Sequence, residues 1–228
     1  MTEEHLSEEE LETCDPLPAI NVPHAVSNDC LPYRIGLTGN IATGKSNVGQ
    51  LLKDLGAAYI DADKVAHEMM LPGAAAYQAV VAHFGETVLA PDGSIDRRAL
   101  GAIVFSDPQA LQHLEQLVHP ATIAEVEHRI QVSGAAVVVV EAIKLLESGM
   151  AETYDAIWVT TCTEEEQVYR LENSRGLNRT EALHRIHAQP PQAEKLARAD
   201  VIIDTGGTKA ETRAQVLVAW GKIPHCDS

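Results

Sequence analysis

Residues 39–46 read Gly-Asn-Ile-Ala-Thr-Gly-Lys-Ser and fit the pattern G-x-x-x-x-G-K-[ST] at every fixed position. The glycines let the backbone curl, so that consecutive N–H groups point at phosphate oxygens. The helix that begins near Lys45 directs its partially positive N-terminus to the same point. The sequence therefore predicts a nucleotide site in which Lys45 reaches the β- and γ-phosphates. The Ser46 hydroxyl is expected to complete the shell of a Mg²⁺ ion.

The segments on either side of this loop fit a phosphate site. Tyr33–Thr38 is a short, largely apolar run of the kind that forms a buried strand. Lys45–Leu55 then places valine and leucine at helical spacing, and Gly56 predicts the end of that helix. GTPases, motor ATPases and small-molecule kinases all share such a loop, so it predicts nucleotide binding and leaves the reaction open.

Further apolar runs extend the pattern into a sheet. They predict four more strands, over Ala57–Ile60, Ala135–Val140, Ala156–Thr161 and Val201–Ile203. Their β-branched composition is typical of parallel strands that are buried on both faces. Five strands separated by helical segments favour an α/β fold with a five-stranded parallel sheet and helices on both faces.

The interval between the second and third predicted strands is long and helical in pattern. Its spacing predicts helices over Ala74–His83, Arg98–Val104, Pro108–Val118 and Pro120–Val132, with a turn at residues 91–93. We interpret residues 74–133 as a helical insertion that covers substrate. The rest of the fold, residues 33–73 and 134–221, is then a nucleotide-binding core.

The charge of the chain limits its partners. With 17 basic and 33 acidic residues, the formal net charge is −16, which disfavours broad nucleic-acid or membrane-surface binding. The first 33 residues carry eight carboxylates and no Lys or Arg. We expect residues 1–32 to be an acidic, disordered or loosely docked extension without a catalytic role.

The chain also lacks signals for export or membrane insertion. Its longest apolar run, Ala135–Val140, is far shorter than the roughly 20 residues that span a bilayer. The N-terminus has no basic and apolar regions of the kind that form a signal peptide. The four cysteines form no C-x-x-C pair, so we expect free thiols and a cytoplasmic protein.

Two carboxylates follow the second predicted strand, at Asp61 and Asp63. The carboxyl end of that strand is expected beside the phosphate loop, in the crevice where ligands bind. A carboxylate there can accept a hydroxyl proton or organise Mg²⁺ during phosphoryl transfer. The alternative is that Asp63 caps a helix over Lys64–Met70. We favour the catalytic interpretation for Asp63, and favour it less for Asp61.

Three arginines, Arg170, Arg175 and Arg179, follow the fourth predicted strand in a polar helical stretch. Small kinases place a lid over ATP here, which we assign to about residues 164–190. Arginine can neutralise charge on the transferring group, although a solvated surface position is the usual alternative. Arg175, beside Gly176 in a predicted turn, is our first choice for a catalytic lid residue.

The chain resembles the dephospho-CoA kinase family in a series of motifs that follow one another in order from about Arg34 to Trp220. The motifs are Ile35–Ser46, Leu55-Gly56, Ile60–Asp63, Phe84-Gly85, Asp92–Arg97 with Leu100, Val104-Phe105, Leu114-Glu115, His119-Pro120, Leu145–Glu147, Arg185-Ile186 with Gln189, and Ala199–Asp204.

This resemblance implies an enzyme that transfers the γ-phosphate of ATP to the ribose 3′-hydroxyl of dephospho-CoA, the last step of coenzyme A biosynthesis. It implies a nucleotide core, a helical CoA-binding domain and a lid, with Mg²⁺ as cofactor and a monomeric or small homo-oligomeric state. The implied ATP site comprises Gly39, Ala42, Thr43, Gly44, Lys45, Ser46, Asn47 and Arg175. The implied substrate side comprises Thr38, Asp61, Asp63, Arg97 and His119. For His119 we rate a structural cap or a core hydrogen bond above direct ligation.

The sequence departs from the family pattern at several positions. Asn40 and Ala42 replace glycines; we expect Ala42 to be tolerated only at negative φ, and Asn40 to accept left-handed geometry more readily. Asn47 stands where Thr is usual, and Thr205 stands where Asn is common. Lys144 occupies the Pro position of a Pro-Leu-Leu motif, where it either contacts substrate phosphate or is simply exposed.

Two other functions stay open at this point. The first is another nucleoside or nucleotide monophosphate kinase with the same core, which the insertion and the His-Pro motif disfavour. The second is a nucleotide-binding homologue without catalytic activity, which the intact Lys45-Ser46 pair disfavours. A GTPase would carry an N-K-x-D signature, and the chain has none.

Overall fold

The computed structural model describes residues 31–147 and 149–224, so nearly all of the predicted acidic extension lies outside the described residues. Its centre is a sheet of five parallel strands: β1 (Tyr33–Thr38), β2 (Ala58–Asp61), β3 (Val137–Glu141), β4 (Ala156–Thr161) and β5 (Val201–Asp204). Their order is β2-β3-β1-β4-β5. The predicted α/β fold with a five-stranded parallel sheet is confirmed.

The order of the strands places the phosphate loop at the centre of one edge of the sheet. β1 lies between β3 and β4, with Leu37 opposite Glu141 and Thr38 opposite Val159. All five strands run in the same direction, so their carboxyl ends meet at this edge. The loops that follow β1, β2 and β3 therefore lie close together.

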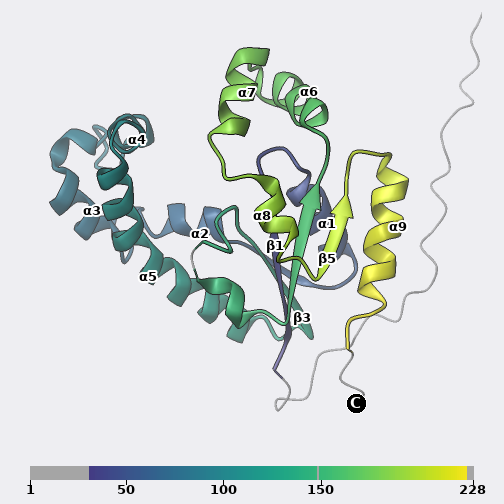
Figure 1. Ribbon diagram of the computed structural model, residues 1–228. Helices are drawn as coiled ribbons and strands as arrows, with labels where there is room; N and C mark the ends of the chain where they lie inside the picture. The colour runs from purple at the N-terminus through teal and green to yellow at the C-terminus, as the bar shows by residue number, and fades with distance from the viewer. Residues whose placement is uncertain (1–30, 148, 225–228) are drawn as a thin grey trace, which may run out of the picture.

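Helices cover both faces of the sheet because alternate side chains of a strand point to opposite faces. On one face, Val137 and Val139 pack in a cluster with α1 (Lys45–Asp54) and α9 (Lys209–Trp220). On the other face, Val138 and Val140 pack in a cluster with α2 (Ala62–Glu68) and the C-terminal half of α5 (Pro108–Val132). Figure 1 shows α9 and α5 on opposite sides of the strands.

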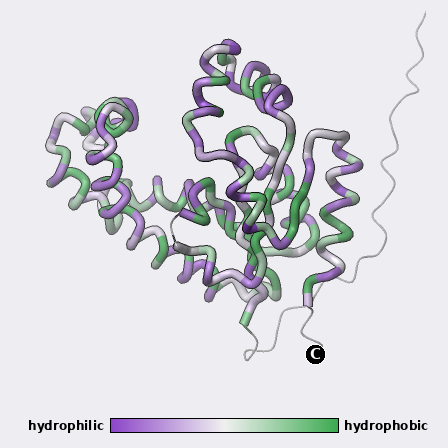
Figure 2. The backbone as a smooth tube through the Cα atoms, viewed as in Figure 1, coloured by the Kyte–Doolittle hydropathy of each residue, from purple (hydrophilic) through white to green (hydrophobic). Residues whose placement is uncertain are grey.

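The predicted insertion forms a helical group that lies away from the sheet (Figure 1). It contains α3 (Tyr77–Phe84), the 3₁₀ helix η1 (Glu86–Val88), α4 (Arg97–Ser106) and the N-terminal half of α5 (Pro108–Val132). These elements bury a core of their own, which includes Val80, Val88, Leu100, Val104 and Val118. Figure 2 shows hydrophobic and hydrophilic stretches alternating along these helices.

The prediction of two helices divided at Pro120 is wrong, because α5 runs through this proline without interruption. Proline removes a helical hydrogen bond and crowds the preceding turn, which usually ends a helix. Here the helix is held on both sides of Pro120. Val118 packs in the core of the insertion, and Val126 and Ile130 pack against the sheet. The packing of both halves outweighs the local preference.

The lid region consists of two helices, α6 (Glu164–Arg175) and α7 (Arg179–His187), followed by α8 (Gln192–Leu196). The two helices bury Val168, Leu171, Ala182 and Ile186 in a cluster against which Ile41 and Ala42 of the phosphate loop also pack. A further 3₁₀ turn, η2 (Met150–Thr153), precedes β4. None of the helices in the described part of the chain is long and apolar enough to cross a bilayer.

Candidate active site

Two glycines of the phosphate loop stand where a side chain would not fit. At Gly39, with φ of 152°, a Cβ would lie 2.5 Å from Thr160 Oγ1 and 2.6 Å from the Thr160 carbonyl oxygen. At Gly44, with φ of 86°, a Cβ would lie 2.9 Å from Thr205 Oγ1. These close approaches bring the loop against the ends of β4 and β5.

Side chains from outside the phosphate loop occupy several of its polar backbone groups. The N–H groups of Asn40 and Ile41 donate to the side-chain oxygens of Gln192 (3.0 Å) and Gln189 (2.6 Å). The Ile41 carbonyl accepts from Gln167 Nε2 at 2.6 Å. None of these three glutamines was predicted as a site residue, because their contacts with the loop cross more than a hundred residues of sequence.

Five backbone N–H groups of residues 39–46 have no partner among the described residues: those of Gly39, Ala42, Gly44, Lys45 and Ser46. Backbone groups left without a protein partner are available to a ligand or to solvent. Those of Gly44, Lys45 and Ser46 lie at the start of α1, where the helix presents its partial positive charge. The arrangement suits an anion such as a nucleotide phosphate.

Lys45 lies in this anion-binding loop and is 7% exposed. Its Nζ donates to the carbonyl oxygens of Gly39 at 2.9 Å and Asn40 at 3.2 Å. Burial lowers the pKa of Lys45, while the nearby carboxylates of Glu141 and Asp63 act in the opposite direction. Ser46, the next residue, is exposed at the helix N-terminus, where its hydroxyl is accessible.

Asp61, and not Asp63, caps the helix after β2. The Asp61 carboxylate accepts from the Lys64 N–H at 2.9 Å, and α2 begins at Ala62. The alternative role considered for Asp63 therefore belongs to Asp61. The Asp63 Oδ2 accepts a long hydrogen bond of 3.4 Å from the Ile143 N–H, at the end of β3. Desolvation and the negative charge of Asp61 raise the pKa of Asp63, whereas the hydrogen bond from the Ile143 N–H and the charges of Lys45 and His67 lower it.

A third carboxylate, Glu141, lies at the carboxyl end of β3 and was not predicted. It is 6% exposed and accepts a 2.5 Å hydrogen bond from the Tyr59 hydroxyl. Burial raises the pKa of Glu141, whereas the Tyr59 hydrogen bond and Lys45 lower it. A sequence signal was present, since Glu141 is the one charged residue that ends the apolar run of β3.

The side of the site that faces the insertion is more exposed. Arg97, the first residue of α4, donates to His67 Nε2 of α2 at 2.9 Å, and both side chains are exposed. Desolvation and the charge of Arg97 lower the pKa of His67. His67 also lies within electrostatic reach of Asp63, so it links the predicted residues Arg97 and Asp63.

Two further residues predicted on the substrate side occupy different environments. Thr38 is fully buried and its hydroxyl donates to the Ile143 carbonyl at 3.2 Å, so its side chain supports the segment after β3. His119 is partly exposed in α5. It has no hydrogen-bonding partner among the residues that the structure describes, which disagrees with the structural cap or core hydrogen bond that we rated higher.

Two lysines near the site have protein partners. Lys144 forms an ion pair with Glu115 of α5 and is half-exposed. Lys195 of α8 was not predicted; it is 3% exposed and donates to the Ile143 carbonyl and to Glu147 Oε1 at 3.2 Å. Lys195 lies close enough to Lys45 to lower its pKa.

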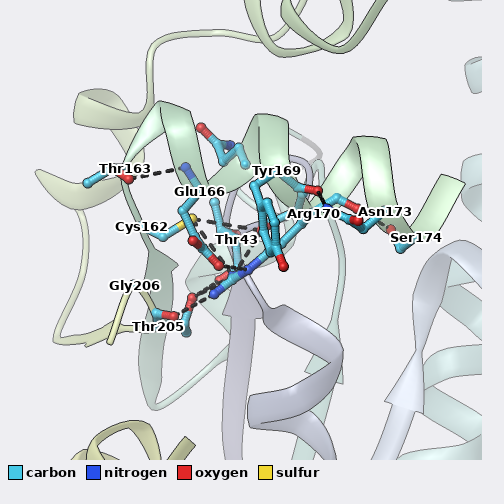
Figure 3. Close-up of polar contacts among 12 residues, drawn as sticks. Thr43, Cys162, Thr163, Glu166, Tyr169, Arg170, Asn173, Ser174, Thr205 and Gly206 are labelled. Atoms are coloured by element: carbon cyan, nitrogen blue, oxygen red, sulfur yellow. Dashed lines mark hydrogen bonds and ion pairs between the residues drawn. The ribbon is translucent and has the colours of Figure 1, made fainter. Parts of the chain in front are cut away.

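The three arginines of the lid region differ in their contacts. Arg175 is exposed at the end of α6, before the left-handed Gly176, and its charge lowers the pKa of Lys45. Arg179 pairs with Glu165 at the surface, at 2.7 Å. Arg170 is instead turned inward, onto the phosphate loop and Thr205 (Figure 3). The structure therefore separates a residue free to meet a ligand, Arg175, from one that is already engaged.

The expectation for Ala42 is wrong: its φ is +59°, and it is the one non-glycine residue with positive φ in the described part of the chain. Asn40, expected to accept this geometry more readily, does not adopt it. The left-handed region costs an L-residue roughly 1–2 kcal/mol. Ala42 keeps this conformation because the surrounding contacts hold the loop in this shape.

A phosphate loop after β1, a lysine within it, and carboxylates at the ends of β2 and β3 define a P-loop kinase. The family model described as dephospho-CoA kinase matches residues 33–211. The chain is 45% identical over 191 residues to the dephospho-CoA kinase of Geobacter sulfurreducens, covering 82% of this chain and 97% of that protein. It is 46% identical over 189 residues to that of Symbiobacterium thermophilum, covering 82% and 79%. The chain belongs to the dephospho-CoA kinase family, whose members are ATP-dependent phosphotransferases of coenzyme A biosynthesis.

Solved structures share this fold. A crystal structure from Thermus thermophilus matches with a TM-score of 0.77 at 33% identity, covering 86% of this chain and all of that one. The dephospho-CoA kinase from Campylobacter jejuni matches with a TM-score of 0.62 at 29% identity, covering 83% of this chain and 96% of that one.

Proposed function

We propose that this protein is a cytoplasmic dephospho-CoA kinase, which transfers the γ-phosphoryl group of ATP to the ribose 3′-hydroxyl of dephospho-CoA. The observation that carries the proposal is that a loop suited to binding phosphate and a carboxylate able to accept a proton lie at the same edge of the sheet. An anion-binding loop with unpaired N–H groups lies beside Asp63, a carboxylate that makes only one long hydrogen bond among the described residues. The membership of the chain in the family supports the choice of substrates.

In this proposal the phosphate loop binds ATP. The N–H groups of Ala42, Gly44, Lys45 and Ser46 donate to phosphate oxygens, and the Lys45 ammonium neutralises charge on the β- and γ-phosphates. The loop is already shaped by its contacts with the protein, so little further ordering accompanies binding. Arg175 would meet the phosphates from the lid, residues 164–190.

Asp63 is the proposed general base. As the 3′-oxygen attacks the γ-phosphorus, the O–H bond of the ribose breaks and the proton passes to the Asp63 carboxylate. The new bond joins the 3′-oxygen to phosphorus, and the bond from phosphorus to the oxygen of the β-phosphate breaks, releasing ADP. A carboxylate with a raised pKa is a stronger base than an ordinary aspartate, which favours this role.

The residues around the loop fit a Mg²⁺ ion. In the described residues, no group of three His, Cys, Asp or Glu side chains could hold a metal ion. Mg²⁺ with a nucleotide needs few protein ligands, because phosphate oxygens and water supply most of its shell. The Ser46 hydroxyl would be a direct ligand, with Asp63 and Glu141 as hard oxygen groups nearby. Bound Mg²⁺ would neutralise charge on the phosphates.

The acceptor would lie between the core and the insertion, residues 74–133. Arg97 is an exposed cation at the start of α4, suited to a phosphate of dephospho-CoA. His119 has an imidazole without a partner among the described residues, so it is available to the same ligand. Asp61 caps α2 and would act on this side mainly by fixing the position of Asp63.

A coupled assay of Mg²⁺-dependent ADP release tests the proposal, with dephospho-CoA as acceptor and nucleoside monophosphates as controls. The expected result is release with dephospho-CoA alone. Release only with a monophosphate would keep the kinase class and overturn the substrate. Binding of ATP without release to any acceptor would indicate a homologue without catalytic activity.

A further inference from the structure

Ala42 holds a backbone conformation that its own residue type disfavours. Its φ of +59° lies in the left-handed region, which glycine occupies without cost and alanine rarely occupies. Neighbouring groups must over-determine such a conformation for it to persist. The contacts of the Ala42 carbonyl therefore show what maintains the loop.

The strongest of these contacts comes from Arg170, 128 residues away along the chain. Arg170 Nη1 donates to the Ala42 carbonyl at 3.1 Å and to Thr205 Oγ1 at 2.9 Å, and Nη2 donates to the Thr205 carbonyl at 2.5 Å. Glu166, one turn earlier in α6, accepts from Arg170 Nε at 2.8 Å. In Figure 3, dashed lines join the Arg170 guanidinium to Glu166 and Thr205.

Thr205 extends the same contact to the next peptide of the loop. Its hydroxyl accepts from Arg170 and donates to the Thr43 carbonyl at 2.8 Å. In a planar trans peptide the C=O and N–H groups point in opposite directions. Holding the Thr43 carbonyl toward Thr205 therefore directs the Gly44 N–H away from Thr205. That N–H is one of the groups without a partner among the described residues.

We propose that Arg170 is a positioning residue, which holds Ala42 in the left-handed conformation and, through Thr205, aims the Gly44 N–H at a phosphate of the nucleotide. This inference rests on the proposed ATP site. A direct role of Arg170 on ATP is disfavoured by geometry, because each of its three guanidinium nitrogens already has an acceptor in the protein.

A double-mutant cycle of Arg170→Lys and Ala42→Gly tests the inference. Lysine cannot reproduce the forked contacts of arginine. With Ala42 in place, Arg170→Lys is expected to raise KM for ATP about ten-fold, the effect of losing support for a conformation of this cost. In the Ala42→Gly background the same change should raise KM no more than about two-fold, because glycine takes the conformation unaided.

The same cycle is measured by urea unfolding without nucleotide. Arg170→Lys should lower the free energy of unfolding less in the Ala42→Gly background than in the parent protein. Equal losses in both backgrounds, in unfolding and in KM, would overturn the inference. If the unaltered protein bound no ATP, the proposed function would fail, and the unfolding cycle would still decide whether Arg170 supports Ala42.

Thr205→Val provides a second route should Arg170→Lys fail to fold. It removes the hydroxyl that joins Arg170 to the Thr43 carbonyl, and it should raise KM for ATP by a smaller factor that Ala42→Gly again suppresses. An unchanged KM in Thr205→Val would contradict the proposed link. Arg198→Lys is the matched control: Arg198 is an exposed arginine, and the change should leave KM and unfolding unaltered.

Discussion

The phosphate loop and the acceptor side of the same site are built in opposite ways. Lys45, Thr43 and Asn40 of the loop are 7%, 1% and 5% exposed. Side chains of α6, of Gln192 and of Thr205 form hydrogen bonds with its backbone groups. On the acceptor side, Asp63, His67 and Arg97 are exposed and make few contacts. The helices that carry Arg97 and His119 also have a core of their own.

This difference indicates that the two halves of the site bind their ligands in different ways. The proposed nucleotide half is shaped by protein contacts before a ligand binds, as suits a site that must place phosphate oxygens accurately. The acceptor half keeps its polar groups free and would be completed by the substrate itself. Substitutions that alter one half at a time distinguish the contributions of the two.

The largest effect is expected at the centre of the nucleotide half. Lys45→Ala removes the ammonium from a buried anion site, so kcat/KM should fall about 10³-fold, a typical cost for loss of a group that stabilises transition-state charge. Steady-state kinetics with ATP and dephospho-CoA measure it. The control is Lys53→Ala in the last turn of the same helix, an exposed lysine, which should change little.

Asp63→Asn tests the boundary between the two halves. It keeps the size of the side chain and an acceptor for the Ile143 N–H but loses the base, so kcat should fall about 10²- to 10⁴-fold. KM for ATP should stay within about two-fold, since the loop is untouched. Near-normal turnover of Asp63→Asn would contradict the assignment of Asp63 as the base. Asp54→Asn, on the exposed surface of α1, is the control.

The pH dependence should report the same group. Asp63 accepts a proton only when ionised, and its pKa lies above the ordinary value because of desolvation and Asp61. Activity should therefore fall on acidification at a higher pH than for an ordinary aspartate, whose pKa is about 3.9. A pH profile of kcat/KM for the acceptor checks this. An acid limb of the same shape in Asp63→Asn would assign it to another group.

A smaller effect is expected from the acceptor half. Arg97→Ala should raise KM for dephospho-CoA about ten-fold, through loss of a charge-assisted contact. KM for ATP should not change. The neighbouring residue gives a matched control, because Arg98 is also exposed and takes part in the start of α4 only through its backbone N–H. Arg98→Ala should leave both KM values unchanged. If Arg97→Ala and Arg98→Ala changed the KM values for ATP and dephospho-CoA equally, the two halves of the site would not be distinct.

The smallest effect concerns stability. The pKa of Asp63 is raised in the folded chain, so its ionisation costs stability above that pKa, and the cost disappears as the pH falls through it. Asp63→Asn should therefore unfold at slightly higher urea concentration than the parent at pH 7. At a pH where Asp63 is protonated, the gain should be lost. A parent that is more stable than the variant at pH 7 would contradict the predicted sign.

Several elements could be predicted because their signals are local. The bounds of β1 and β4 agree with the predicted strands, since each is an apolar run bounded by polar or turn-forming residues. The start of α1 follows from the loop motif itself. Local rules failed at Pro120, where packing on both sides kept one helix, and at the start of α2, where the cap considered at Asp63 is Asp61.

The sequence by itself determined the phosphate loop, the parallel sheet that carries it and the carboxylates that follow β2, because each depends on residues close together in the chain. Only the tertiary structure decided that Ala42 is left-handed, that Arg170 and three glutamines support the loop, and that Glu141 and Lys195 lie beside it. Those contacts join residues far apart in the sequence. They depend on the order of the strands and on how the helices pack, which no local pattern specifies.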